Sequence, residues 1–84
     1  MHSSIIKTTI DVRSVTPHER HPLVFESFMQ LEPGESMLLI SDHDPKSLFY
    51  QFRTELGDSF FWDYQEKGPE VWQVQIGKAA LCCS

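Results

Sequence analysis

The most constraining feature of this sequence is a continuous apolar run at residues 36–42, Ser-Met-Leu-Leu-Ile-Ser-Asp. A short apolar run without alternation is typical of a strand that has neighbours on both flanks. A helix-like segment with a proline near its start lies on either side of the run in sequence. We therefore expect residues 36–42 to form a central strand between two helices.

The first helical segment carries one apolar stripe, made of Val24, Phe25, Phe28 and Leu31. Pro22 suits the first position of a helix, because its missing N–H costs nothing there. A competing start lies at Thr16, with Glu19 in capping-box spacing. A helix begun there would carry Pro22 in its interior and be kinked. We therefore expect a single turn at 16–20 and the main helix at 22–31.

The second helical segment has clearer boundaries. Asp44 is placed to be the N-cap and Pro45 the first helical residue, which together form a strong start signal. Gly57 is placed to end the helix. The apolar residues between them recur at helical spacing and should face inward: Leu48, Phe49, Phe52 and Leu56.

Three further segments alternate with a period of two, as half-buried strands do. They cover 5–12, 59–66 and 70–77, and they orient these apolar residues inward: Ile6, Ile10, Val12, Phe60, Trp62, Tyr64, Trp72, Val74 and Ile76. The element order is β-α-β-α-β-β, in which strand–helix–strand units make right-handed parallel crossovers and the last two strands form a hairpin. The fold class is α/β, a two-layer sandwich with helices on one sheet face. Phe61 and Val71, on the opposite face, are candidates for a small interaction patch.

Length and charge restrict the broad class. A chain of 84 residues is one domain, with an ordered core at about 5–77 and a flexible tail at 78–84. The net charge is −5 with only 7 Lys and Arg, so nucleic-acid binding is not expected. No apolar stretch approaches the roughly 20 residues that span a bilayer, and the start lacks a signal-peptide pattern. We expect a cytoplasmic protein without membrane association that has a protein partner.

Several segments in order resemble a bacterial family, the domain-of-unknown-function family 2249, over about residues 9–77. The segments are Ile10-Asp11-Val12-Arg13, Glu19-Arg20-His21-Pro22, Pro33-Gly34-Glu35, Asp42-His43-Asp44-Pro45, Tyr50-Gln51-Phe52 and Gly68-Pro69-Glu70-Val71-Trp72. That family is similar to the TusA/SirA sulfur carriers. The resemblance implies a four-stranded mixed sheet of order 1-2-4-3 with both helices on one face.

The resemblance also shows a departure. The carriers have a Cys-Pro-x-Pro motif where the first helix begins, and the position of its cysteine falls on Pro17. Proline has no thiol, so the persulfide chemistry is not inherited at that position. Relatives in the family are associated with hemerythrin-like domains and nitrogen-oxide metabolism, which suggests a metal or redox setting by association.

Polar residues follow the first and second strands, whose carboxyl ends would share one edge of the sheet. Ligands in open α/β sheets bind outside these ends. The residues are Arg13, His18, Arg20, His21, Asp42, His43 and Asp44. Two imidazoles and a carboxylate, from His21, His43 and Asp44, suit iron or zinc with an open coordination position. The remaining four, Arg13, His18, Arg20 and Asp42, are candidate ligand-binding residues.

Other interpretations of these residues stay open. Two helix starts flanked by Arg13 and Arg20 also suit a small anion, and the imidazole of His43 can change charge there. In a purely structural interpretation, Asp44 caps a helix, Asp42 pairs with Arg13, and His21 bonds a loop carbonyl.

The sequence therefore favours a small, non-enzymatic binding or accessory module with no catalytic residues. Its polar edge would bind a metal ion or a small anion. One alternative is a sulfur or redox relay that uses the adjacent pair Cys82 and Cys83. Another is a purely structural protein-interaction domain.

Overall fold

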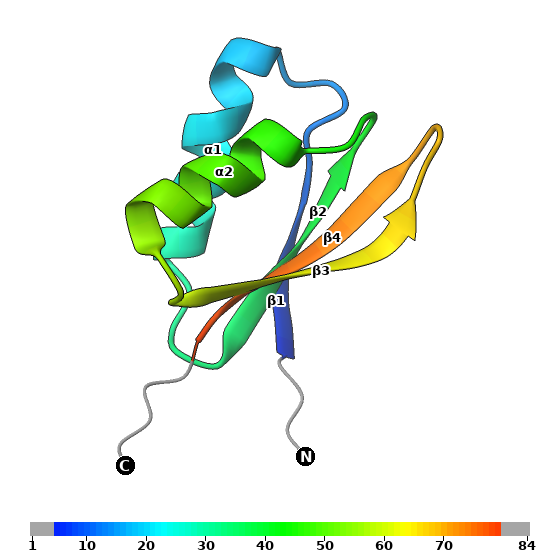
Figure 1. The fold of residues 1–84 in the computed structure, drawn as a ribbon. Helices are drawn as coiled ribbons and strands as arrows, with labels where there is room; N and C mark the ends of the chain where they lie inside the picture. Colours follow the sequence, from blue (N-terminus) through cyan, green and yellow to red (C-terminus); the bar gives the residue numbers. More distant parts are fainter. Residues whose placement is uncertain (1–4, 80–84) are drawn as a thin grey trace.

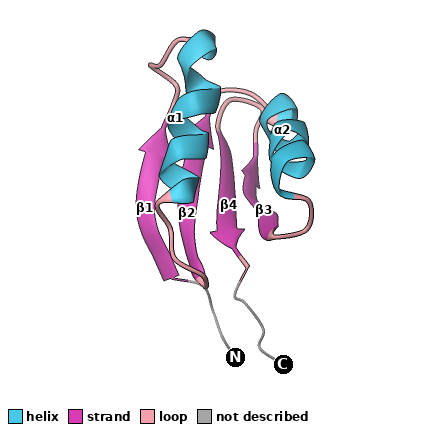
Figure 2. Ribbon diagram, turned by 90° about the vertical axis from the view of Figure 1, so that its left-hand side faces the viewer, coloured by secondary structure: helices cyan, strands magenta, loops and turns pink. Residues whose placement is uncertain are grey.

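The computed structural model describes residues 5–79 and has the predicted element order (Figure 1). The elements are β1 (Ile5–Asp11), α1 (Pro17–Met29), β2 (Glu35–Ser41), α2 (Lys46–Leu56), β3 (Phe60–Lys67) and β4 (Trp72–Lys78). The sheet order is β1-β2-β4-β3, with β1 and β2 parallel and the other two pairs antiparallel. Both helices lie on the same face of the sheet (Figure 2). The α/β two-layer fold predicted from the sequence is confirmed. Neither of the two described helices is long and apolar enough to cross a bilayer.

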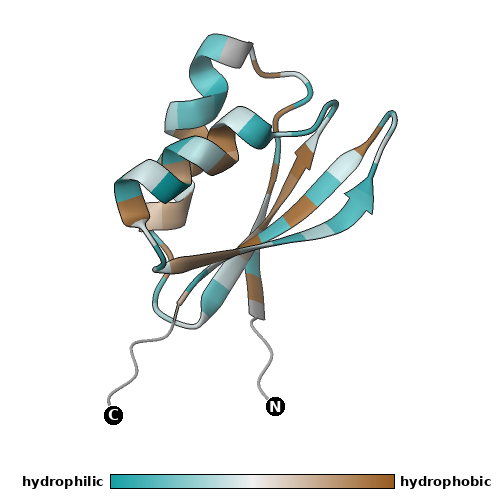
Figure 3. Ribbon diagram, in the orientation of Figure 1, coloured by the Kyte–Doolittle hydropathy of each residue, from teal (hydrophilic) through white to brown (hydrophobic). Residues whose placement is uncertain are grey.

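The core lies between β2 and the two helices. Met37 and Leu39 of β2 are fully buried, as are Val24 of α1 and Phe52 of α2. The Phe52 ring meets the Phe28 ring edge-on, with centroids 5.2 Å apart. Apolar residues, brown in Figure 3, occur in both helices and in the strands of the sheet. Because this layer is thin, aromatic rings supply much of its buried area.

The aromatic residues of the hairpin extend this core, as predicted. Phe60, Trp62 and Tyr64 are partly buried against it. The Trp62 ring lies 5.2 Å from the ring of Phe49 in α2, measured between centroids. These rings therefore pack α2 onto β3 and are not available as a ligand platform.

Several polar side chains on the helix-free face of the sheet are bonded to one another. Gln75 Nε2 donates to Ser36 Oγ at 2.9 Å, across β4 and β2. Gln65 Nε2 donates to both Gln75 Oε1 and Asp63 Oδ2, at 3.3 and 3.2 Å. These bonds link three neighbouring strands on the side where the sequence predicts polar residues.

The predicted start of α1 is wrong. The helix begins at Pro17 and carries Pro22 inside it. Pro17 takes the first helical position, where a missing N–H costs nothing. The turn that follows is held by tertiary contacts, because the Arg20 guanidinium donates to the Val15 carbonyl at 2.8 Å and pairs with Asp42. These contacts offset the single intrahelical bond that Pro22 removes.

The predicted capping role of Asp44 is also wrong. Helix α2 begins at Lys46, with Pro45 at the N-cap and no side-chain cap. The Asp44 carboxylate instead accepts a hydrogen bond from the Tyr64 hydroxyl at 2.6 Å. Asp44 therefore fixes the loop after β2 to strand β3.

Two strand predictions also need correction. Ile6 is 45% exposed and not inward-facing, because an irregularity in the β1–β2 register between Ile6 and Thr8 shifts it to the other sheet face. The predicted tail begins too early, because Lys78 belongs to β4 and the Ala79 N–H donates to the Ser59 carbonyl. The remainder of that tail, including Cys82 and Cys83, lies outside the described residues.

Candidate functional site

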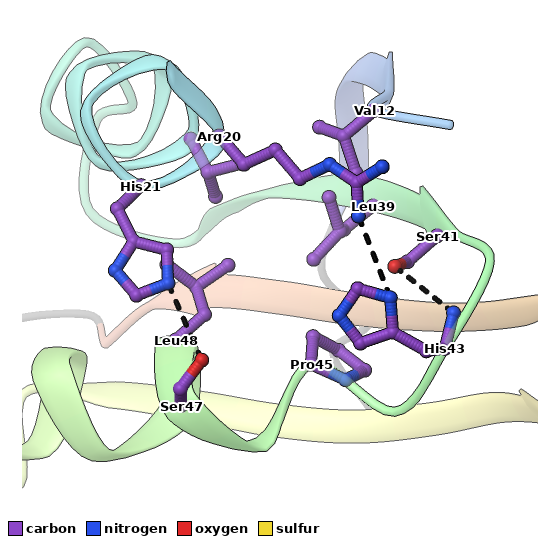
Figure 4. Close-up of a pocket in the computed structure, with 10 residues that line it drawn as sticks. Val12, Arg20, His21, Leu39, Ser41, His43, Pro45, Ser47 and Leu48 are labelled. Atoms are coloured by element: carbon purple, nitrogen blue, oxygen red, sulfur yellow. Dashed lines mark hydrogen bonds between the residues drawn. The ribbon is translucent and has the colours of Figure 1, made fainter. Parts of the chain in front are cut away.

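A small pocket lies where β1 and β2 end and the first turns of α1 and α2 approach each other (Figure 4). Its volume is about 30 Å³, which suits a ligand of only a few heavy atoms. The pocket has an apolar floor and a polar rim. Its lining residues are Val12, Arg20, His21, Val24, Leu39, Ser41, His43, Pro45, Ser47 and Leu48. The location is the one that the strand order predicts for a ligand.

Arg20 is the main charged group of this pocket. Its side chain is only 12% exposed, and its Nη1 donates to Asp42 Oδ1 at 3.2 Å. Its Nε donates to the Val15 carbonyl at 2.8 Å, which fixes the direction of the guanidinium. Its Nη1 also lies 3.4 Å from His43 Nδ1, and its Nη2 lies 3.5 Å from Asp42 Oδ2. A guanidinium has five N–H groups, so one is left for a further acceptor.

His43 forms the outer wall, and Asp42 contacts it from outside the pocket lining. His43 Nδ1 lies 2.8 Å from Asp42 Oδ1, and the His43 N–H donates to Ser41 Oγ at 3.4 Å. The hydrogen bonds from His43 and then from Arg20 lower the pKa of Asp42 to about 2. Asp42 is therefore ionised at neutral pH and balances the charge of Arg20.

His21 joins the two helices on the inner wall. Its Nδ1 lies 2.8 Å from Gln51 Oε1, and its Nε2 lies 3.4 Å from Ser47 Oγ. Ser47 and Gln51 are one helical turn apart on α2, so both reach the same imidazole. Ser47 was missed at the sequence level, although its spacing from Gln51 is a usable signal. The suggestion that His21 bonds a loop carbonyl is not what these contacts show.

Three of the candidate residues lie away from the pocket. Arg13 pairs with Asp11 at 2.7 Å, so the suggested pair between Arg13 and Asp42 is wrong. His18 is exposed on the first turn of α1 and is absent from the pocket lining. Asp44 is directed to Tyr64. Of the seven candidate residues, Arg20, His21 and His43 line the pocket. Asp42 contacts two of them, Arg20 and His43.

The same contacts bear on the metal hypothesis. Among residues 5–79, no three His, Cys, Asp or Glu side chains are grouped as a metal site would need. His21 and His43 both line the pocket, but the carboxylate of Asp44 is engaged elsewhere. The pocket offers imidazole, hydroxyl and guanidinium groups over an apolar floor, which is a set suited to hydrogen bonding with a small polar ligand.

Comparison with known proteins and protein families gives a match to a family model. No curated protein and no solved structure matches this chain. Residues 9–78 match the sequence model of a family described as an uncharacterized conserved protein, DUF2249. That span covers most of the 84 residues. The chain therefore belongs to the DUF2249 family.

Proposed function

We propose that this chain is a non-enzymatic binding or accessory module that takes up a small anion in the pocket between the two helix starts. The observation that carries the proposal is Arg20, a guanidinium that is 12% exposed, fixed in direction, and set in a pocket wall beside two imidazoles. A partly buried cation attracts an anion more strongly than a surface cation does, because water screens it less.

The surroundings of Arg20 limit the affinity. Asp42 already pairs with the guanidinium, so an anion must share Arg20 with a carboxylate that stays ionised above a pKa of about 2. Size sets a further limit, because the best small ligands gain at most about 1.5 kcal/mol per heavy atom. A four-atom anion would then bind no more tightly than about tens of micromolar. Titrations should reach millimolar concentrations.

The test is an NMR titration of isotope-labelled protein with sodium nitrate at constant ionic strength. Amide signals of Ser41, His43 and Ser47 should shift and saturate. Arg20→Lys keeps the charge but loses the fork geometry, and we expect it to weaken binding about tenfold. Arg53→Lys, on the exposed side of α2, is the matched control and should bind as the unmodified chain does.

Asp42→Asn should change the affinity for nitrate in the opposite direction. Removing the competing carboxylate should strengthen nitrate binding several-fold, because the guanidinium then carries an unbalanced charge. Shifts that do not saturate, or an Arg20→Lys variant that binds like Arg53→Lys, would contradict the anion proposal.

Metal binding is a second candidate function of the pocket, and one contact favours it. Asp42 holds His43 Nδ1 at 2.8 Å, which is how carboxylates orient metal-binding histidines and leave Nε2 as the ligand. Iron or zinc would then bind His21 and His43. A zinc titration of untagged protein that moves both imidazole signals with one-to-one stoichiometry, and that His21→Ala removes, would replace the anion proposal.

Other expectations remain part of the proposal. The element order and sheet order support a likeness to the TusA/SirA carriers, and we place the chain in a bacterial cytoplasm with a protein partner. A relay based on Cys82 and Cys83 predicts that deleting residues 81–84 abolishes function while His21→Ala and His43→Ala have no effect. The anion proposal predicts that the same deletion leaves nitrate binding unchanged.

A further inference from the structure

We propose that the pocket prefers a singly protonated oxyanion, of the size and shape of bicarbonate, over an anion that has no proton. This inference rests on the proposed function, because it concerns the ligand class of the same pocket. Its basis is that the pocket wall presents a hydrogen-bond acceptor, His21 Nε2, as well as the donors of Arg20.

The contact with Gln51 sets which His21 nitrogen is the acceptor. An amide oxygen can only accept, so the 2.8 Å contact between Gln51 Oε1 and His21 Nδ1 places the imidazole proton on Nδ1. A neutral imidazole carries one proton, and Nε2 is therefore left with a lone pair. The geometry makes Nε2 an acceptor at the rim of the pocket.

This acceptor is only weakly occupied. Its partner Ser47 Oγ lies 3.4 Å away, well beyond the usual separation of about 2.8 Å for a hydroxyl donor. Ser47 is exposed, and its hydroxyl can turn to solvent or to a ligand. A ligand O–H can therefore take the Nε2 lone pair without leaving a buried group unsatisfied.

The donors belong to a different residue. Arg20 Nε contacts Val15, its Nη1 contacts Asp42 and His43, and its Nη2 lies 3.5 Å from Asp42 Oδ2. One Nη2 N–H is left, and it suits an unprotonated oxygen of an oxyanion. An anion held by Arg20 on one side and by His21 Nε2 on the other must carry one hydroxyl. The volume of about 30 Å³ limits it to a few heavy atoms.

Bicarbonate and nitrate separate this inference from simple charge attraction. Both are planar anions with four heavy atoms and one negative charge, and only bicarbonate carries a hydroxyl proton. We would measure both affinities by NMR titration at pH 8 and constant ionic strength. We expect bicarbonate to bind about tenfold more tightly than nitrate, as one satisfied hydrogen bond implies.

Variants identify the residue responsible. His21→Ala should bring the two affinities within about twofold of each other, because the acceptor is gone. His18→Ala, also on the first turns of α1 but outside the pocket, should keep the full preference. Ser47→Ala removes the competing hydroxyl and should increase the preference, which provides a second variant if His21→Ala does not fold.

The outcomes are distinct. Equal binding of the two anions, or a preference for nitrate, would overturn the inference and leave the anion site standing. A bicarbonate preference that persists in a folded His21→Ala variant would also overturn it. If neither anion binds up to the high millimolar range, the proposed function fails and the inference fails with it.

Discussion

The ring of Phe61 in β3 lies across Gly77, its cross-strand partner in β4 on the helix-free face of the sheet. A Cβ added at Gly77 would overlap this ring, so the absence of a side chain at position 77 makes room for the phenyl group. Phe61 is 37% exposed while Gly77 is buried. The ring thus covers backbone that no helix covers, as aromatic residues do beside strand glycines.

Gly77→Ala should therefore destabilise the domain. We expect a loss of about 1–2 kcal/mol in the free energy of unfolding, because the Phe61 ring must swing into water. The measurement is urea unfolding followed by tryptophan fluorescence. In a Phe61→Ala background the same change should cost nothing or stabilise. Equal effects of Gly77→Ala in both backgrounds would show that the ring is not the cause.

The bond between Tyr64 and Asp44 supports the loop that carries the pocket. Burial first, and then the bond to Asp44, raise the pKa of the Tyr64 hydroxyl. Tyr64→Phe keeps the ring but loses the 2.6 Å hydrogen bond, and we expect it to cost about 1–2 kcal/mol. Tyr50→Phe is the matched control, because Tyr50 is 62% exposed, and it should change the unfolding free energy by less than about 0.5 kcal/mol.

The fold could be predicted from the sequence because its main signals are local. The apolar run at 36–42 and the stop at Gly57 depend on burial and on local backbone preference, which a single sequence displays. The helix start at Pro17 could not be predicted, because one contact of Arg20 that holds that turn is made with Asp42, which lies far along the chain. The prediction that Ile6 faces inward was wrong for a similar reason, because a register irregularity leaves no signal in the sequence pattern.

The site was predicted in part. Arg20, His21 and His43 do reach one pocket, as expected from the strand order. The carboxylate next to these residues is set by side-chain partners. Asp42 pairs with Arg20, and Asp44 accepts a hydrogen bond from Tyr64. Both choices are fixed by tertiary geometry, so neighbouring aspartates with the same local signal took different roles.

Lowering the pH should remove the stability that ionised Asp42 contributes through its contacts with Arg20 and His43. Its folded pKa of about 2 lies below the value of about 3.9 for an unfolded aspartate, so its stabilising effect is present above about pH 4 and lost as the pH falls toward 2. We expect Asp42→Asn to be less stable than the unmodified chain at pH 6. The gap should close between about pH 4 and pH 2. Urea unfolding of both proteins at several pH values tests this, and a gap that stays constant down to pH 2 would contradict the assigned pKa.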